Sequence, residues 1–136
     1  MRVVGLDLGE RRIGVAVSDP RGVVASPHSV LQRSGSHAGD HRAIAAVVEE
    51  YEAELLVVGL PRSMDGGLGP AARAALAEVD ELALALDVPV ETVDERLTTV
   101  SAERSLRELS VKGGARRAVV DKVAAAILLQ AWLDRG

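Results

Sequence analysis

The sequence predicts a single α/β domain over residues 1–136, built on a mixed five-stranded sheet with helices on both faces. Two observations predict it. The apolar segments 2–8 and 12–18 are joined by a link too short for a crossover, so they must pair antiparallel as a hairpin. Further along, the short continuous apolar run 55–59 and the expected strand 90–93 alternate with stretches of helical periodicity. That alternation is typical of parallel strands joined by helices on both faces of a sheet.

The first half of the chain contains two further expected elements. A third strand is expected over residues 22–31, followed by a polar loop over 33–41. A helix is expected to begin at Asp40 or His41, because apolar residues then recur at helical spacing. Its apolar face comprises Ile44, Val47, Val48 and Tyr51.

The second half begins with a loop rich in glycine and proline over residues 60–70. The next helix is expected to bury an apolar face of Ala72, Leu76, Val79, Leu82, Ala83 and Leu86. Thr98 or Thr99 can cap a helix that runs to about Leu109. A basic stretch over 110–117 then leads to a last helix that ends near Leu133. This order of elements fits a ribonuclease H-like layout.

Composition excludes several classes of function. The chain has no cysteine, so disulfides, thiolate metal sites and cysteine nucleophiles are excluded. Tyr51 and Trp132 are its aromatic residues, too few for base stacking on aromatic platforms. The first residues do not form a signal segment and no apolar run is long enough to span a membrane, so a cytoplasmic protein without a membrane partner is expected. The net charge is −4, but acidic residues concentrate in 43–95 and basic residues in 96–122.

Asp7 is the first candidate functional residue. It lies within the apolar segment VVGLDL, one residue from the expected end of the strand. Burying an ionised carboxylate costs several kcal/mol unless it is neutralised, and a metal ion is a common means of neutralising it. The structural alternative is that Asp7 caps the following turn through the amides of Gly9 or Glu10.

Asp94 and Glu95 follow the strand 90–93. Neighbouring side chains on a strand point to opposite faces, so the two acids cannot both face one cleft. We favour Glu95 for the cleft beside Asp7, with Asp94 paired to Arg96 or capping the next helix. Both acids could instead be charges favoured by the N-terminus of that helix.

Asp121 lies on or beside the apolar face of the last helix, and pairing with Arg117 is its structural alternative. Asp7, Glu95 and Asp121 would form a ligand set of oxygen atoms alone, which suits Mg²⁺ or Mn²⁺ rather than Zn²⁺. Such ions can activate water against a phosphodiester. The sequence therefore indicates a metal-dependent hydrolase.

Basic residues lie next to these acids in the sequence and could bind backbone phosphates. They are Arg11, Arg12, Arg96, Lys112, Arg116, Arg117 and Lys122. A solvated basic surface is the alternative, and Arg96 could instead neutralise a neighbouring acid. Residues 64–67 form a candidate flap over the site. The histidines, His28, His37 and His41, lie outside these motifs and are expected on the surface or in loops.

Four segments spread along the chain carry a family resemblance. They are GLDLGERRIGVAVSD (5–19), VVGLPRSMDG (57–66), DERLTTVSAE (94–103) and VDKVAAAILLQAWLD (120–134). Together they resemble the YqgF/RuvX family, whose members are described as Holliday junction resolvases or as nucleases that mature the 5′ end of 16S rRNA. The resemblance implies a metal-dependent endonuclease with Asp7, Glu95 and Asp121 at the family's acidic positions. Related resolvases often carry a fourth acid one helical turn after the last, where this chain has Ala124 and Ala125.

Other readings of these residues stay open. The Asp-Leu-Gly turn also resembles the phosphate loop of actin-like ATPases and sugar kinases, and a non-catalytic binding module is a third possibility. Structured RNA and branched DNA present the same phosphates, so the residues do not separate processing of pre-16S rRNA from resolution of Holliday junctions. A resolvase requires two sites related by a two-fold axis, hence a homodimer, whereas a processing nuclease can be a monomer.

Overall fold

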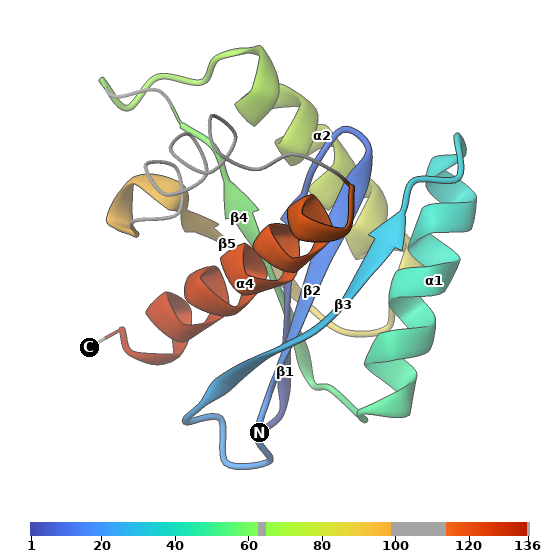
Figure 1. Cartoon of the computed structure of the whole chain (residues 1–136), viewed down its shortest axis with the longest axis vertical. Coiled ribbons are helices and arrows are strands. Elements are labelled where there is room, and N and C mark those ends of the chain that lie inside the picture. Colours follow the sequence, from blue (N-terminus) through green and yellow to red (C-terminus); the bar gives the residue numbers. More distant parts are fainter. Residues whose placement is uncertain (63–64, 99–113, 136) are drawn as a thin grey trace.

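The computed structural model describes residues 1–62, 65–98 and 114–135, with the backbone alone at 97 and 114–120. It contains one five-stranded sheet in the order β3-β2-β1-β4-β5 (Figure 1). The elements are β1 (Val3–Leu8), β2 (Arg12–Ser18), β3 (Ala25–Gln32), α1 (His37–Glu50), β4 (Leu55–Leu60), α2 (Pro70–Ala85), β5 (Val90–Asp94), the 3₁₀ turn η1 (Glu95–Leu97) and α4 (Gly114–Leu133). The expected mixed sheet is confirmed.

Strand pairing follows the prediction. β1 and β2 form an antiparallel hairpin in which Asp7 is opposite Gly14. The hairpin closes where the Gly9 N–H donates to the Arg12 carbonyl at 2.9 Å. β4 runs parallel to both β1 and β5. The carboxyl ends of β1, β4 and β5 therefore meet at one edge of the sheet, which is where ligands collect in such sheets.

Helices cover both faces of the sheet, as predicted. α4 crosses one face diagonally, and α1 and α2 cover the other (Figure 1). The core under α4 contains Val3, Ala16, Leu55, Val57, Val93, Ala125, Leu128, Leu129 and Trp132. The core under α1 and α2 contains Val4, Leu6, Ile13, Val15, Ile44, Val47, Leu56, Val58, Val79 and Leu82. In the part of the chain that the structure describes, no helix is long and apolar enough to cross a membrane.

Three strand glycines let α4 approach the sheet closely. A Cβ added at Gly14 would lie 2.1 Å from the carbonyl oxygen of Asp121. One added at Gly5 would lie 2.7 Å from Cβ of Leu129, and one at Gly59 would lie 2.5 Å from Cδ1 of Leu128. Contacts this short cannot form, so a larger residue at any of the three positions would push the helix away. The Gly14 contact fixes where Asp121 lies.

Two boundaries differ from the prediction. β3 begins at Ala25 rather than near residue 22, because Asp19 organises the preceding turn by accepting the N–H groups of Val23 and Val24. α1 begins at His37 rather than at residue 40 or 41, because the Ser36 side chain accepts the Gly39 N–H and caps the helix. The first turn of α1 lacks an apolar residue on the core face, so periodicity alone places the start too late.

The buried face of α2 also differs from the prediction. Ala72, Val79 and Leu82 are buried as expected, whereas Ala83 is exposed. Glu78 occupies the buried face with 4% exposure. The helix expected to end at Leu109 lies outside the described residues.

Candidate functional site

Two buried carboxylates lie at the carboxyl edge of the parallel strands. Asp7 is the penultimate residue of β1 and is 6% exposed, and Glu95 directly follows β5 and is 3% exposed. Gly5, two residues before Asp7 on β1, packs on Leu129 of α4. Because side chains two residues apart on a strand share a face, Asp7 also lies on the α4 face of the sheet. β5 contributes Val93 to the same face two residues before Glu95. The site therefore lies beside α4, with β4 between the two acids.

Asp94 is engaged elsewhere, as expected. Its carboxylate accepts the Nε and Nη2 groups of Arg96, at 2.6 Å for the shortest of these contacts. It also accepts the Arg96 backbone N–H at 2.9 Å, so Asp94 caps η1. The hydrogen bonds from Arg96 lower the pKa of Asp94. The expected pairing of Asp94 with Arg96 is confirmed, the helix that it was expected to cap lies outside the described residues, and Glu95 is the more buried acid of the two.

Asp121 projects from α4 at the point where that helix packs on Gly14. Because Gly14 is the cross-strand partner of Asp7, the two acids lie at the same end of the sheet. Oδ2 of Asp121 accepts the Nε–H of Arg12 at 2.6 Å. The ion pair thus joins α4 to β2. The Arg117 side chain, the partner considered from the sequence, is outside the described atoms.

The three acids share one end of the α4 face without closing into a tight ligand sphere. Among the described residues, the group of acidic and histidine side chains whose ligand atoms all lie within 4.8 Å of one another is His37, His41 and Glu78. Those residues lie on α1 and α2, on the other face of the sheet. One oxygen of Asp121 is held by Arg12 instead. Closer convergence of the acids on a cation would need that side chain to turn or to use its second oxygen.

The predicted phosphate-binding residues have different environments. Arg11 is exposed in the β1–β2 turn, whereas Arg12 is partly buried against Asp121. Arg96 is held by Asp94, which is the neutralising role considered from the sequence. Lys122 is partly buried on α4. Lys112 lies outside the described residues, and only the backbone of α4 is described at residues 116 and 117.

Arg62 was missed by the sequence interpretation. It follows β4 and approaches Asp94, with 4.0 Å between its Nη1 and Oδ2. Its Nε is buried and lacks a hydrogen-bond partner among the described groups. Two guanidinium groups, those of Arg62 and Arg96, therefore face one carboxylate next to Glu95. The signal that could have identified Arg62 is its position directly after a strand that ends at the ligand-binding edge.

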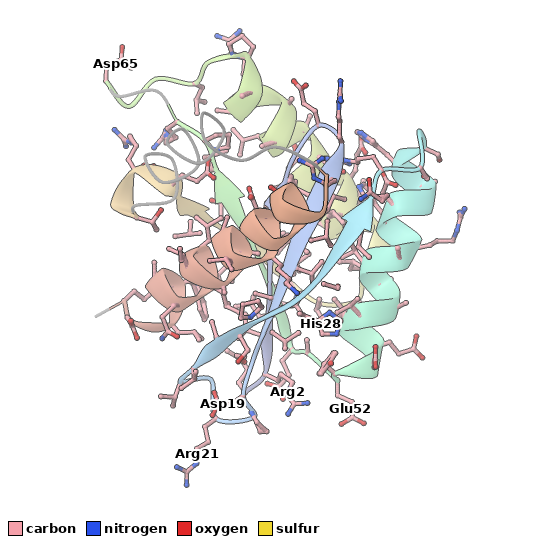
Figure 2. The ribbon with its side chains drawn as sticks, in the orientation of Figure 1. Arg2, Asp19, Arg21, His28, Glu52 and Asp65 are labelled. Atoms are coloured by element: carbon pink, nitrogen blue, oxygen red, sulfur yellow. The ribbon has the colours of Figure 1, made fainter. Side chains whose placement is uncertain are left out.

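The loop after β4 lies against the same end of the site. A Cβ at Gly66, where φ is +86°, would lie 3.0 Å from Nη1 of Arg96. Asp65 accepts the Gly67 N–H at 2.8 Å. Asp65 lies at one end of the molecule, whereas Asp19 and Arg21 lie at the opposite end (Figure 2). Positions 63 and 64 lie outside the described residues, so the flap expected over 64–67 stays a prediction.

One histidine contradicts the expectation that all three lie on the surface or in loops. His41 is 5% exposed and contacts Glu78, with 2.9 Å between Nε2 and Oε2. Glu78 also accepts two hydrogen bonds from Arg33, at 2.7 and 2.8 Å. Burial alone would raise the pKa of Glu78, but its bonds to Arg33 and His41 lower it. A lone histidine on a helix gives no sequence signal of a buried carboxylate partner.

Comparison with known proteins adds the decisive observation. The family model described as "RuvX: Holliday junction resolvase" matches residues 1–135. This chain belongs to the RuvX family. A relative from Halothermothrix orenii is 46% identical over 134 residues, covering 98% of this chain and 95% of its own length. One from Mycobacterium sp. (strain KMS) is 48% identical over 135 residues, covering 98% and 80%. Both relatives are named "Putative pre-16S rRNA nuclease".

A solved structure supports the fold of this RuvX-family chain. "T. thermophilus RuvC in complex with Holliday junction substrate" superposes with a TM-score of 0.60 at 21% identity. The match covers 98% of this chain and 93% of that one. At this identity the comparison establishes the ribonuclease H-like fold, in agreement with the layout predicted from the order of elements.

Proposed function

We propose that this chain is a divalent-metal-dependent endonuclease for structured RNA and that its reaction is processing of the 5′ end of pre-16S rRNA. The observation that carries the proposal is the pair of buried carboxylates, Asp7 and Glu95, at the carboxyl edge of β1 and β5. Carboxylates at the edge where ligands collect are donors that a divalent cation can bind. The names of the relatives support the substrate.

The donor set fits Mg²⁺ or Mn²⁺. Asp7, Glu95 and Asp121 offer carboxylate oxygens alone, the ligands that these hard cations prefer. Bound there, the cations would supply an activated water and neutralise charge on the phosphodiester. Arg12 holds Asp121 at the edge of the site, and the packing of α4 on Gly14 fixes its backbone. Ala124 and Ala125 are buried, and their side chains carry no ligand atom.

The basic side chains have a separate role in the proposal, which is to position the backbone of the substrate. Contacts to phosphate fix register without reading sequence. Arg11 is exposed on the turn that follows Asp7, and Arg62 and Arg96 flank Asp94 beside Glu95. Of the other predicted residues, Arg12 lies at the start of β2 and Lys112 precedes α4 in the chain. Arg116, Arg117 and Lys122 belong to α4 and would continue this surface.

Resolution of Holliday junctions is the second candidate function. The description of the matched family model favours it. Two strand cuts at a junction require two active sites related by symmetry, hence a homodimer. Cleavage of a four-way junction and of a pre-16S 5′ region in one buffer, with the mass of the protein in solution, separates the candidates. Faster cutting of the junction by a dimer would displace the RNA assignment.

Asp7→Asn tests the proposed site directly. We expect it to abolish Mn²⁺-dependent cleavage and to leave nucleic-acid affinity within about twofold, because it removes a cation ligand without removing a basic residue. Asp19→Asn is the matched control, since Asp19 lies at the opposite end of the molecule (Figure 2). Cleavage by the Asp7→Asn protein at the wild-type rate would refute the assignment of the metal site.

A further inference from the structure

A second cluster of possible metal ligands joins the two helices on the face opposite α4. His37 and His41 are one helical turn apart on α1, and Glu78 and Glu81 are neighbours on the facing side of α2. Nδ1 of His37 lies 2.7 Å from Oε2 of Glu81. Nε2 of His41 lies 2.9 Å from Oε2 of Glu78. The ligand atoms of His37, His41 and Glu78 all lie within 4.8 Å of one another.

We propose that His37, His41, Glu78 and Glu81 form a site for a Zn²⁺-class transition-metal ion that clips α1 to α2. Two imidazoles and two carboxylates make a mixed nitrogen and oxygen donor set, which suits Zn²⁺ and differs from the oxygen donors around Asp7. The sheet separates this cluster from the proposed nuclease site, because Asp7 faces α4. The two sites would therefore load independently.

Three of the proposed ligands already lie near one another, and Glu81 joins them through its contact with His37. Zn²⁺ binds nitrogen and oxygen at about 2.0–2.2 Å, so two tetrahedral ligand atoms lie roughly 3.3 Å apart. The two histidine–carboxylate contacts, at 2.7 and 2.9 Å, would each open by about half an ångström. His37 and Glu81 can move that far, because their side chains are 56% and 50% exposed. Each ring nitrogen that becomes a ligand would carry no proton, the proton being released to solvent or held on the other ring nitrogen.

The charges around the cluster favour a dication. Arg33 is the positive group in contact with it, and it donates to both oxygens of Glu78 and to Asp40. The cluster also contains three carboxylates, those of Asp40, Glu78 and Glu81. With both histidines neutral, the single positive charge of Arg33 therefore leaves two negative charges uncompensated. Glu10 and Arg42, which line the adjoining cavities, offset each other. A divalent ion would neutralise the remainder.

Solvent can reach the cluster from two sides. A cavity of about 420 Å³ is lined by His37, Asp40 and Glu78, and one of about 410 Å³ by His37, His41 and Glu81. His37 belongs to both, so an ion can reach its ring without unfolding of the helices. Arg33 also donates from Nε to the carbonyl of Gly9 at 3.0 Å, so it ties the cluster to the turn that follows Asp7.

The experiment is titration of the full chain with Zn²⁺ by calorimetry, after removal of metal and with millimolar Mg²⁺ present to fill oxygen-donor sites. His37→Ala and Glu81→Gln are the test variants, since both positions are exposed and should fold normally. His28→Ala is the matched control, because it also removes one histidine. His28 packs against Tyr51 at the far end of α1, with 5.0 Å between ring centroids. Asp7→Asn tests whether the nuclease site contributes.

We expect one Zn²⁺ per chain, with affinity reduced at least about tenfold in His37→Ala and Glu81→Gln. His28→Ala and Asp7→Asn should bind within about twofold of wild type. Saturating Zn²⁺ should raise the Tm of the wild type and of the control but not of His37→Ala. Absence of saturable Zn²⁺ binding by the wild type would overturn the proposal, and so would unchanged affinity in both test variants. Loss of binding in Asp7→Asn alone would assign the ion to the nuclease site instead.

Discussion

Gly14→Ala would place a methyl group where α4 touches the sheet. The added Cβ would lie 2.1 Å from the Asp121 carbonyl oxygen and 2.6 Å from its carbonyl carbon, whereas ordinary contact begins near 3.4 Å. The obstacle is backbone, so α4 or β2 must shift by about 1.3 Å to restore contact. Overpacking of this kind costs about 1–3 kcal/mol of unfolding free energy. The same shift carries Asp121 away from Asp7, and a misplacement of about 1 Å can cost roughly 100-fold in rate.

The assay combines urea unfolding with cleavage of a pre-16S 5′ region, expressed per folded molecule. Gly5→Ala is the matched control. Its Cβ would lie 2.7 Å from Cβ of Leu129, so it also pushes on α4, but at a point further along the helix than Asp121. We expect Gly5→Ala to lose stability while retaining activity within about threefold, and Gly14→Ala to lose both. Wild-type cleavage by folded Gly14→Ala protein would refute the claim that this contact positions the site.

Two further predictions concern stability. Leu128→Ala should lower the unfolding free energy by about 2–5 kcal/mol, because Leu128 is 1% exposed on the side of α4 that packs on the sheet. Leu84→Ala, at a side chain 90% exposed, should change the unfolding free energy by less than about 0.5 kcal/mol. Equal losses of stability in the two variants would contradict the burial of Leu128 against the sheet. Asp19 has its pKa lowered by hydrogen bonds from the Val24 and Val23 amides. The folded chain therefore binds this proton less readily than the unfolded chain, so the stabilisation is present above the ordinary value of 3.8 and lost as the pH falls below it. Between about pH 6 and pH 3, the unfolding free energy measured in urea should fall less steeply for Asp19→Ala than for the wild type. The same pH dependence in both proteins would exclude this contribution of Asp19.

Local pattern was enough to predict the strands and their pairing. The short link between β1 and β2 permits a hairpin and little else, and the uninterrupted apolar run of β4 predicts a buried parallel strand. Asp7 stands out because it is a charge within such a run. The alternation of side chains along a strand predicts different surroundings for Asp94 and Glu95. Asp94 pairs with Arg96 and Glu95 is buried, whereas the position of Glu95 in a metal site stays a prediction.

Helix starts and buried polar groups were less predictable. The start of α1 depends on a cap from Ser36 and not on apolar spacing. Burial of Glu78 depends on Arg33, which comes 45 residues earlier in the chain. A glutamate on an apolar helix face has the same local sequence whether or not such a partner exists. The sequence therefore gave no indication of the cluster formed with His41.

The amino-acid sequence by itself determined which segments are strands and helices, and that one acid lies within a buried strand, because periodicity and turn length act over a few residues. Only the tertiary structure decided which charges meet. Asp121 pairs with Arg12, which is 109 residues away, because the small Gly14 lets α4 pack directly against β2. Electrostatic pairing depends on distance in space, and the folded backbone sets that distance.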